Sequence, residues 1–227
     1  GLAIARCLAE AGAHVHAFSR TGRAKTGGRQ ARVVQHAIDV TDTATLAEAV
    51  RDIGRRKGLD FVVHAAGITA RAVFAEGTAA DWRRIQEVNV TAAAELARGA
   101  YPFLKKSRHP GRMLFITSMA AHLGFAEVAP YCASKAAVLG LMRALAVEWA
   151  GDGILVNSIA PGWFPTAMTA KVMDVDRRKK ILARMPLHRF GRADELAAGA
   201  LFLLSPAATY ITGHDLAIDG GALAFGY

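Results

Sequence analysis

The sequence has only two cysteines, Cys7 and Cys132, and no long apolar run. Two cysteines predict no disulfide framework, and reduced thiols in a cytoplasmic protein are the simplest interpretation. The longest apolar stretch, from Ala136 to Ala150, is interrupted by Arg143 and Glu148. A membrane span needs roughly 18 to 20 mostly apolar residues, so we expect no contact with a membrane.

Acidic residues are also scarce, with 19 against 28 basic residues and a net charge of +9. Such a balance can indicate nucleic-acid binding. The basic residues are scattered, however, and the one dense run, at 177–180, contains no aromatic residue. We interpret that run as a solvated helix face and expect no nucleic-acid partner and no metal site. The positive charge would instead attract a phosphorylated cofactor or an anionic substrate.

Short β-type runs alternate with longer helical patterns along the whole chain. Strands are predicted at His14–Phe18, Arg32–Ile38, Phe61–Ala65, Met113–Thr117, Ile154–Ile159 and Asp215–Ile218. Helices are predicted at Leu2–Ala11, Ala44–Lys57, Ala79–Lys106, Tyr131–Ala150 and Ala193–Leu204. This alternation predicts an α/β fold with a parallel sheet covered on both faces. No repeat or linker is visible, so we expect one domain spanning residues 1–227.

The strongest chemical pattern combines Ser118, which follows a predicted strand, with Tyr131 and Lys135. Tyr131 and Lys135 stand at i and i+4, so they share one helix face. Oxidation of an alcohol needs a base for the hydroxyl proton, and a nearby ammonium would lower the tyrosine pKa toward neutrality. Ser118 could donate a hydrogen bond to the substrate oxygen. Each residue alone fits a turn, a cap or a surface position, but the three together favour an active site.

This spacing resembles the Ser…Tyr-x-x-x-Lys signature of the short-chain dehydrogenase/reductase family. His64-Ala65-Ala66-Gly67 is similar to its Asn-Asn-Ala-Gly motif, and Asn89 matches the fourth member of its catalytic tetrad. Further matches follow the family's order: Asp39-Val40, Pro161-Gly162, Thr166, Thr212-Gly213 and Asp219-Gly220-Gly221. The resemblance covers essentially the whole chain and implies a doubly wound parallel sheet of the Rossmann type.

The resemblance also implies roles for these residues. Tyr131 would be the general acid/base, and Lys135 would bind the nicotinamide ribose and lower the tyrosine pKa. Ser118 would orient the substrate oxygen, and Asn89 would hold a water in a proton relay, although a helix distortion or cap could also explain Asn89. The cofactor would contact Asp39 and Val40 at its adenine ring, Ala66 and Gly67, and Pro161, Gly162 and Thr166 at its carboxamide.

The amino-terminal end departs from the family pattern. The family begins with a strand and a Thr-Gly-x-x-x-Gly-x-Gly loop that brings backbone N–H groups to the cofactor pyrophosphate. Gly1 matches the last glycine of that loop, so we expect an N-terminally truncated fold that lacks its first strand. The predicted strands His14–Phe18 and Phe61–Ala65 would then each lose a pairing partner, and cofactor binding would be weak.

The residues after the second β-type run of the family pattern predict the cofactor. An acidic residue there would bind the ribose 2′-hydroxyl and repel a 2′-phosphate. This chain has Ser19 and Arg20 instead, and the planar guanidinium suits a phosphate. We therefore predict NADP rather than NAD. The alternative is that Arg20 lies in a solvated turn with Arg23 and Lys25.

The substrate is the least constrained property. The loop from Pro161 to Thr169 and the later Arg189-Phe190-Gly191 resemble gluconate 5-dehydrogenases and related sugar-acid dehydrogenases, which would suit the basic charge. For the substrate, the alternative is that the chain is a 3-oxoacyl-[acyl-carrier-protein] reductase. Trp163 and Phe164 could equally be ordinary apolar packing of a lid. An alternative of another class is a non-catalytic nucleotide-binding or scaffolding relative. The resemblance implies a homotetramer or a homodimer.

Overall fold

The computed structural model describes residues 1–22, 33–166 and 174–225. The helices are α1 (Leu2–Glu10), α2 (Thr43–Lys57), α3 (Ala79–Gln86), α4 (Ala92–Leu104), α5 (Ala129–Trp149), α7 (Val175–Ala183) and α8 (Ala193–Leu204). The strands are β1 (Val15–Ser19), β2 (Val33–Ala37), β3 (Phe61–His64), β4 (Gly111–Ile116), β5 (Ile154–Pro161) and β6 (Asp215–Ile218). The predicted residues Arg23, Lys25, Arg32 and 167–169 lie outside the described residues.

Within the described residues all strand pairs are parallel, and the strands form two sheets. One sheet has the order β1-β2 and the other has the order β3-β4-β5-β6. Within the described residues β1 and β3 share no ladder, as expected for a sheet without a strand between them. Val15 of β1 and Val63 of β3 nevertheless pack into one apolar cluster with α1 and α8. In the described part of the chain, the two sheets therefore share an apolar core although no strand of one pairs with a strand of the other.

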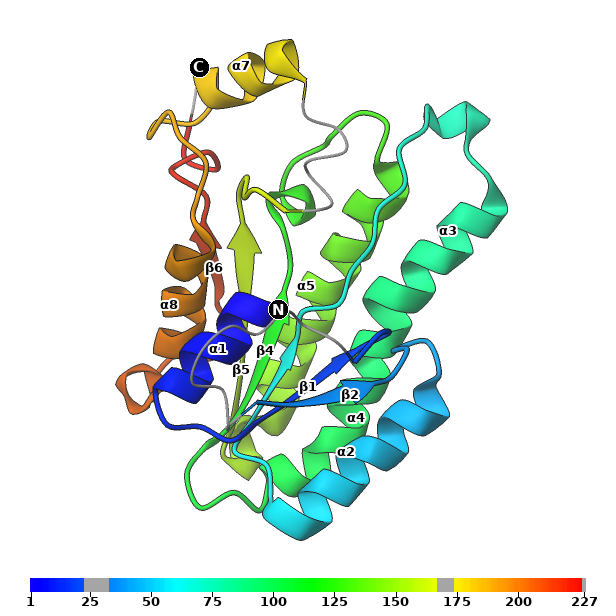
Figure 1. The fold of residues 1–227 in the computed structure, drawn as a ribbon. Coiled ribbons are helices and arrows are strands. Elements are labelled where there is room, and N and C mark those ends of the chain that lie inside the picture. The colour runs from blue at the N-terminus through cyan, green and yellow to red at the C-terminus, as the bar shows by residue number, and fades with distance from the viewer. Residues whose placement is uncertain (23–32, 167–173, 226–227) are drawn as a thin grey trace.

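Helices cover the sheet on two sides (Figure 1). Helices α1 and α8 pack against each other on one side, around buried residues such as Leu8, Ile159 and Leu203. Helices α2, α4 and α5 lie on the other side, around a cluster that includes Leu46 and Phe115. The predicted α/β fold with a parallel sheet is confirmed. Within the described part of the chain, no helix has the length and apolarity that a membrane crossing requires.

The prediction of one helix from Ala79 to Lys106 was wrong. The structure divides it into α3, a π-helical turn η2 (Glu87–Thr91) and α4, which ends at Leu104. A π-helical turn contains one residue more than a regular turn, and the apolar pattern hides this extra residue because it continues on both sides. For most of the other predicted helices and strands, the first and last residues differ from those in the structure by no more than one or two positions. The basic run at 177–180 lies on α7, where all but Arg177 are exposed.

Candidate active site

The structure brings Ser118, Tyr131 and Lys135 together at the carboxyl end of β4. Ser118 follows β4 by two residues, and Tyr131 and Lys135 lie one helical turn apart near the start of α5. Ser118 and Tyr131 are joined by a side-chain hydrogen bond. The Ser118 Oγ also accepts a hydrogen bond from the backbone N–H of Ala120 at 3.1 Å, so this serine caps a short 3₁₀ turn as well.

Lys135 is buried beside the tyrosine. Its side chain is 4% exposed, and its Nζ lies 5.7 Å from the centre of the Tyr131 ring. The ammonium donates a hydrogen bond to the carbonyl oxygen of Ile116 at 2.7 Å. Burial lowers the pKa of Lys135 to about 8, because a desolvated ammonium is less stable than a neutral amine.

The expected lowering of the tyrosine pKa does not appear in this structure. Burial raises the pKa of Tyr131 above its ordinary value, and the neighbouring Cys132 thiol adds to the rise. The hydrogen bond from Ser118 works in the opposite direction and lowers the pKa of Tyr131. The physical reason is that removing the phenolate from water outweighs the stabilising contacts around it. Tyr131 therefore carries its proton at neutral pH in this structure.

Asn89 lies in the π-helical turn η2 and is fully buried. Its Oδ1 accepts from the backbone N–H of Ile68 at 2.8 Å, and its Nδ2 lies 3.0 Å from the Ile68 carbonyl and 2.9 Å from Ser134 Oγ. Ser134 in turn donates to the backbone carbonyl of Tyr131 at 2.7 Å. Asn89 thus ties the loop after β3 to the helix that carries Tyr131. Sequence reasoning missed Ser134, although its place between Tyr131 and Lys135 was a usable signal.

The loop after β3 lies directly against this group. A Cβ atom added at Gly67 would lie 3.5 Å from both Lys135 Nζ and Asn89 Oδ1. Ala66 and Gly67 are half-buried next to the lysine. Gly1 lies close by, since a Cβ atom added there would be 3.7 Å from Ala65 Cβ, and its carbonyl accepts the first hydrogen bond of α1. The N–H groups that begin α1 are therefore near the end of β3, which is a suitable position for a phosphate.

The ends of β1 and β2 place the remaining predicted cofactor residues near one another. The Ser19 carbonyl accepts from the backbone N–H of Ile38 at 2.9 Å. Arg20 follows in an exposed turn, where its charge helps to lower the pKa of Asp39. The larger cause of that lowering is Thr41, whose N–H and hydroxyl both donate to Asp39 Oδ1. Val40 packs against the core beneath them.

At the end of β5, Pro161 and Gly162 meet the C-terminal turn. A Cβ atom added at Gly162 would lie 2.6 Å from Asp219 Cα, so only glycine fits here. Asp219 is 8% exposed and accepts hydrogen bonds from the N–H groups of Gly221 and Leu223. Thr166 lies at the exposed end of the described part of this loop.

Two of the motifs that suggested a substrate have structural roles. Phe164 is 9% exposed, and its ring fills the space where a Cβ atom at Gly191 would lie. Arg189 makes a paired ion contact with both carboxylate oxygens of Glu195, at 2.7 and 2.9 Å. The packing interpretation of Phe164 therefore has direct support, while Trp163 lines a small cavity of about 130 Å³ with Met185.

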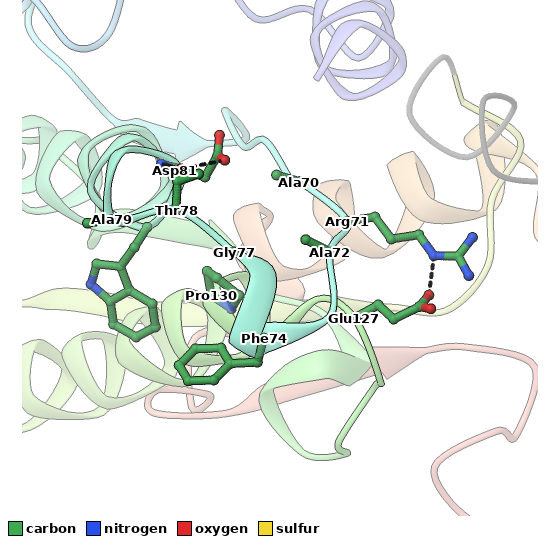
Figure 2. Close-up of a pocket in the computed structure, with 11 residues that line it drawn as sticks. Ala70, Arg71, Ala72, Phe74, Gly77, Thr78, Ala79, Asp81, Glu127 and Pro130 are labelled. Carbon is green, nitrogen blue, oxygen red and sulfur yellow. Dashed lines mark hydrogen bonds and ion pairs between the residues drawn. The ribbon is translucent and has the colours of Figure 1, made fainter.

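A larger groove of about 270 Å³ lies next to the start of α5 (Figure 2). Phe74, Trp82 and Pro130 belong to its apolar part, and an ion pair between Arg71 and Glu127 points away from Phe74 and Pro130. The backbone N–H of Ala72 donates to the Glu127 carbonyl at 2.9 Å and so joins the loop after β3 to the segment before Tyr131. Ser118 and Lys135 do not line this groove.

The site as a whole has the parts that hydride-transfer chemistry requires. A proton carrier, a hydrogen-bond donor and a buried cation meet at the strand ends of a parallel α/β sheet, and the glycine backbone at position 67 lies next to the cation. This combination defines a nucleotide-dependent oxidoreductase of the Rossmann class.

Comparisons with known proteins identify the family. Residues 1–222 match a family model described as enoyl-(acyl carrier protein) reductase. The chain is 34% identical over 230 residues to the 2-dehydro-3-deoxy-D-gluconate 5-dehydrogenase of Bacillus subtilis (strain 168), covering 99% of this chain and 90% of that protein. It is 37% identical over 185 residues to the 3-oxoacyl-[acyl-carrier-protein] reductase FabG of Escherichia coli (strain K12), covering 81% of this chain and 75% of that protein.

A solved structure shows the same fold. The crystal structure of a gluconate 5-dehydrogenase from Burkholderia cenocepacia J2315, in complex with NADP and tartrate, superposes with a TM-score of 0.91 at 32% identity. The match covers 98% of this chain and 90% of that chain. The chain belongs to the short-chain dehydrogenase/reductase family and is a nicotinamide-dependent oxidoreductase.

Proposed function

We propose that the chain interconverts a secondary alcohol and a ketone with NADP, and that Ser118, Tyr131 and Lys135 perform the proton chemistry. The observation that carries this proposal is the hydrogen-bonded Ser118–Tyr131 pair beside the buried ammonium of Lys135. The bound cofactor would supply a hydride to the substrate carbon as NADPH, or accept one from it as NADP⁺.

The protein's own residues handle the substrate oxygen. In the reducing direction, Tyr131 donates its phenolic proton to that oxygen as the carbonyl becomes a hydroxyl. Its raised pKa suits this role, because the proton is present at neutral pH. Ser118 donates a hydrogen bond to the same oxygen and stabilises the charge that develops there. In the oxidising direction Tyr131 accepts the proton, which becomes easier as the pH rises.

The cofactor fits the residues that are present. Gly67 keeps the backbone after β3 close to Lys135, whose ammonium would bind a ribose hydroxyl, and the N-terminus of α1 would offer backbone N–H groups. At the other end of the site, Arg20 is exposed and suits the 2′-phosphate that distinguishes NADP from NAD. Asp39 and Val40 would border the adenine, and Pro161, Gly162 and Thr166 would border the carboxamide.

A sugar acid such as gluconate is the proposed substrate. The support is the net charge of +9, the likeness to the Bacillus subtilis dehydrogenase, and the tartrate in the related crystal structure, which is a small hydroxy acid. The likeness to the FabG reductase keeps a 3-oxoacyl thioester as the second candidate. We further propose a cytoplasmic homotetramer or homodimer.

The decisive experiment follows NADPH oxidation with a panel of keto sugar acids and a 3-oxoacyl thioester. Tyr131→Phe should reduce turnover by about 10²- to 10⁴-fold, the usual contribution of general acid catalysis, while NADPH binding remains near normal. Wild-type turnover by this variant would refute the assignment of Tyr131. Tight NADPH binding without turnover on any substrate would instead favour a non-catalytic relative.

A further inference from the structure

Asp215, the first residue of β6, is a buried carboxylate with three side-chain donors. Its side chain is 4% exposed. Ser158 Oγ donates to Oδ1 at 2.6 Å, and His122 Nε2 lies 2.6 Å from Oδ2. Thr117 Oγ1 lies 2.7 Å from Oδ1 and 2.8 Å from the Ile159 carbonyl oxygen, so these two acceptors share its one hydrogen. A buried carboxylate is very unfavourable unless it is hydrogen-bonded, and this one is bonded on both oxygens.

Two of these donors flank the serine of the active site. Thr117 immediately precedes Ser118, and His122 follows the 3₁₀ turn Met119–Ala121 that Ser118 caps. The single carboxylate of Asp215 therefore holds both ends of the segment from Thr117 to His122. The backbone of Thr117 is also fixed, since its N–H donates to the Ile159 carbonyl at 2.8 Å.

We propose that Asp215 and His122 are positioning residues that hold Ser118 in place against Tyr131. The proposal rests on the function proposed above for Ser118 and Tyr131. A hydroxyl that stabilises a reacting oxygen must be held to within a fraction of an ångström, and a misplacement of 1 Å can reduce a rate by about 10²-fold. The three bonds at Asp215 supply that restraint from β5, β6 and both ends of the serine segment.

A purely structural role for Asp215 would be to fasten β6 to β5 through Ser158. The two roles make different predictions for Tyr131. The hydrogen bond from Ser118 lowers the pKa of Tyr131, whereas burial and Cys132 raise it, and the ammonium of Lys135 lies 5.7 Å from the ring centre. Release of Ser118 should therefore raise the pKa of Tyr131, while a change in strand attachment alone should leave it unaltered.

The test compares Asp215→Asn and His122→Gln with Ser118→Ala. The controls are Asp52→Asn and His109→Gln, which change an exposed aspartate and an exposed histidine away from this segment. The titration of Tyr131 is followed by phenolate absorbance, as the difference between each protein and the same protein carrying Tyr131→Phe. This measurement requires neither cofactor nor turnover.

We expect both variants to shift the Tyr131 titration to higher pH, in the direction of Ser118→Ala, and the controls to leave it unchanged. Combined with Ser118→Ala, Asp215→Asn should add no further shift, because the hydrogen bond is already gone. In turnover, kcat should fall about 10- to 100-fold while the KM for NADPH stays constant.

An unchanged titration in folded Asp215→Asn and His122→Gln proteins would overturn the proposal. If Asp215→Asn fails to fold, His122→Gln decides, because His122 is partly exposed at the end of its turn. If the wild-type protein turns over no substrate, the proposed function fails, yet the titration still decides whether this pair positions Ser118.

Discussion

Replacement of Lys135 by methionine should stabilise the protein near neutral pH while removing activity. Lys135 keeps a charge in a site where it is 4% exposed, and burial lowers its pKa from 10.5 to about 8. At about 1.4 kcal/mol per pKa unit, this lowering means that the charged side chain reduces stability by about 3 kcal/mol at neutral pH. Methionine has a similar unbranched shape and no charge, so Lys135→Met removes this penalty.

The gain in stability from removing the charge is partly offset by the loss of a hydrogen bond to the backbone. The Lys135 ammonium donates to the Ile116 carbonyl, and losing a partner at a buried polar group costs about 1–3 kcal/mol. The net change at neutral pH is therefore a gain of about 0–2 kcal/mol. The dependence on pH gives a sharper test, because the cost at Ile116 does not change with pH.

The direction of that dependence follows from the pKa of Lys135, which is lower in the folded state than in the unfolded chain. Between about pH 8 and 10.5 the unfolded chain binds more protons, so the stability of the wild-type protein gains from rising pH in this range. The advantage of Lys135→Met should thus shrink by about 2 kcal/mol between about pH 7 and pH 9.5.

Urea unfolding of both proteins at a series of pH values measures this difference. Lys179→Met, which changes an exposed lysine on α7, is the matched control and should give a curve parallel to the wild type. Parallel curves for Lys135→Met would show that Lys135 is not desolvated in the folded protein, and the argument from burial would fail.

Three further outcomes are expected. Burial and the charge of the neighbouring Lys135 lower the pKa of His64 to about 3. Acidification from about pH 7 to pH 5 should therefore lower the unfolding free energy of the wild type by about 2 kcal/mol more than that of His64→Asn, as measured by urea unfolding. Equal losses in the two proteins would contradict this. Gly162→Ala should weaken NADPH binding and lower stability, because the added Cβ would collide with the backbone of Asp219. The control Gly140→Ala has free space on an exposed helix face and should leave NADPH binding unchanged. Equal effects of the two substitutions would show that the structure relieves the collision. Arg20→Asp should move the preference from NADP toward NAD in parallel titrations, and a parent protein that already prefers NAD would disprove the assignment.

Local patterns in the sequence were sufficient for most of the fold. The strands around Phe61 and Met113 are recognisable from their apolar runs, and the spacing of Tyr131 and Lys135 places them on one helix face without any tertiary information. The division between β1 and β3 followed from the resemblance to a family with another strand at that position.

Properties that depend on tertiary contacts were not predictable. The rise in the Tyr131 pKa depends on how deeply α5 packs against its surroundings, which spacing alone does not reveal. The contact between His122 and Asp215 joins residues 93 positions apart, so no local periodicity indicates it. Asn89 likewise bonds to the backbone N–H and carbonyl of Ile68, 21 positions earlier in the loop after β3, so the sequence near Asn89 does not indicate these partners.

The π-helical turn between α3 and α4 sets the direction in which the side chains of α4 point relative to those of α3. Each residue of an α-helix advances the direction of the side chains by about 100°, so one residue more or fewer at 87–91 would rotate everything beyond it by that angle. Ala93, Ala97 and Ala100, all within 1% of complete burial on α4, would then turn away from α2 and from the strands β3 and β4. The turn that brings Asn89 into the interior is therefore also the element that keeps the small-residue face of α4 aligned with its neighbours.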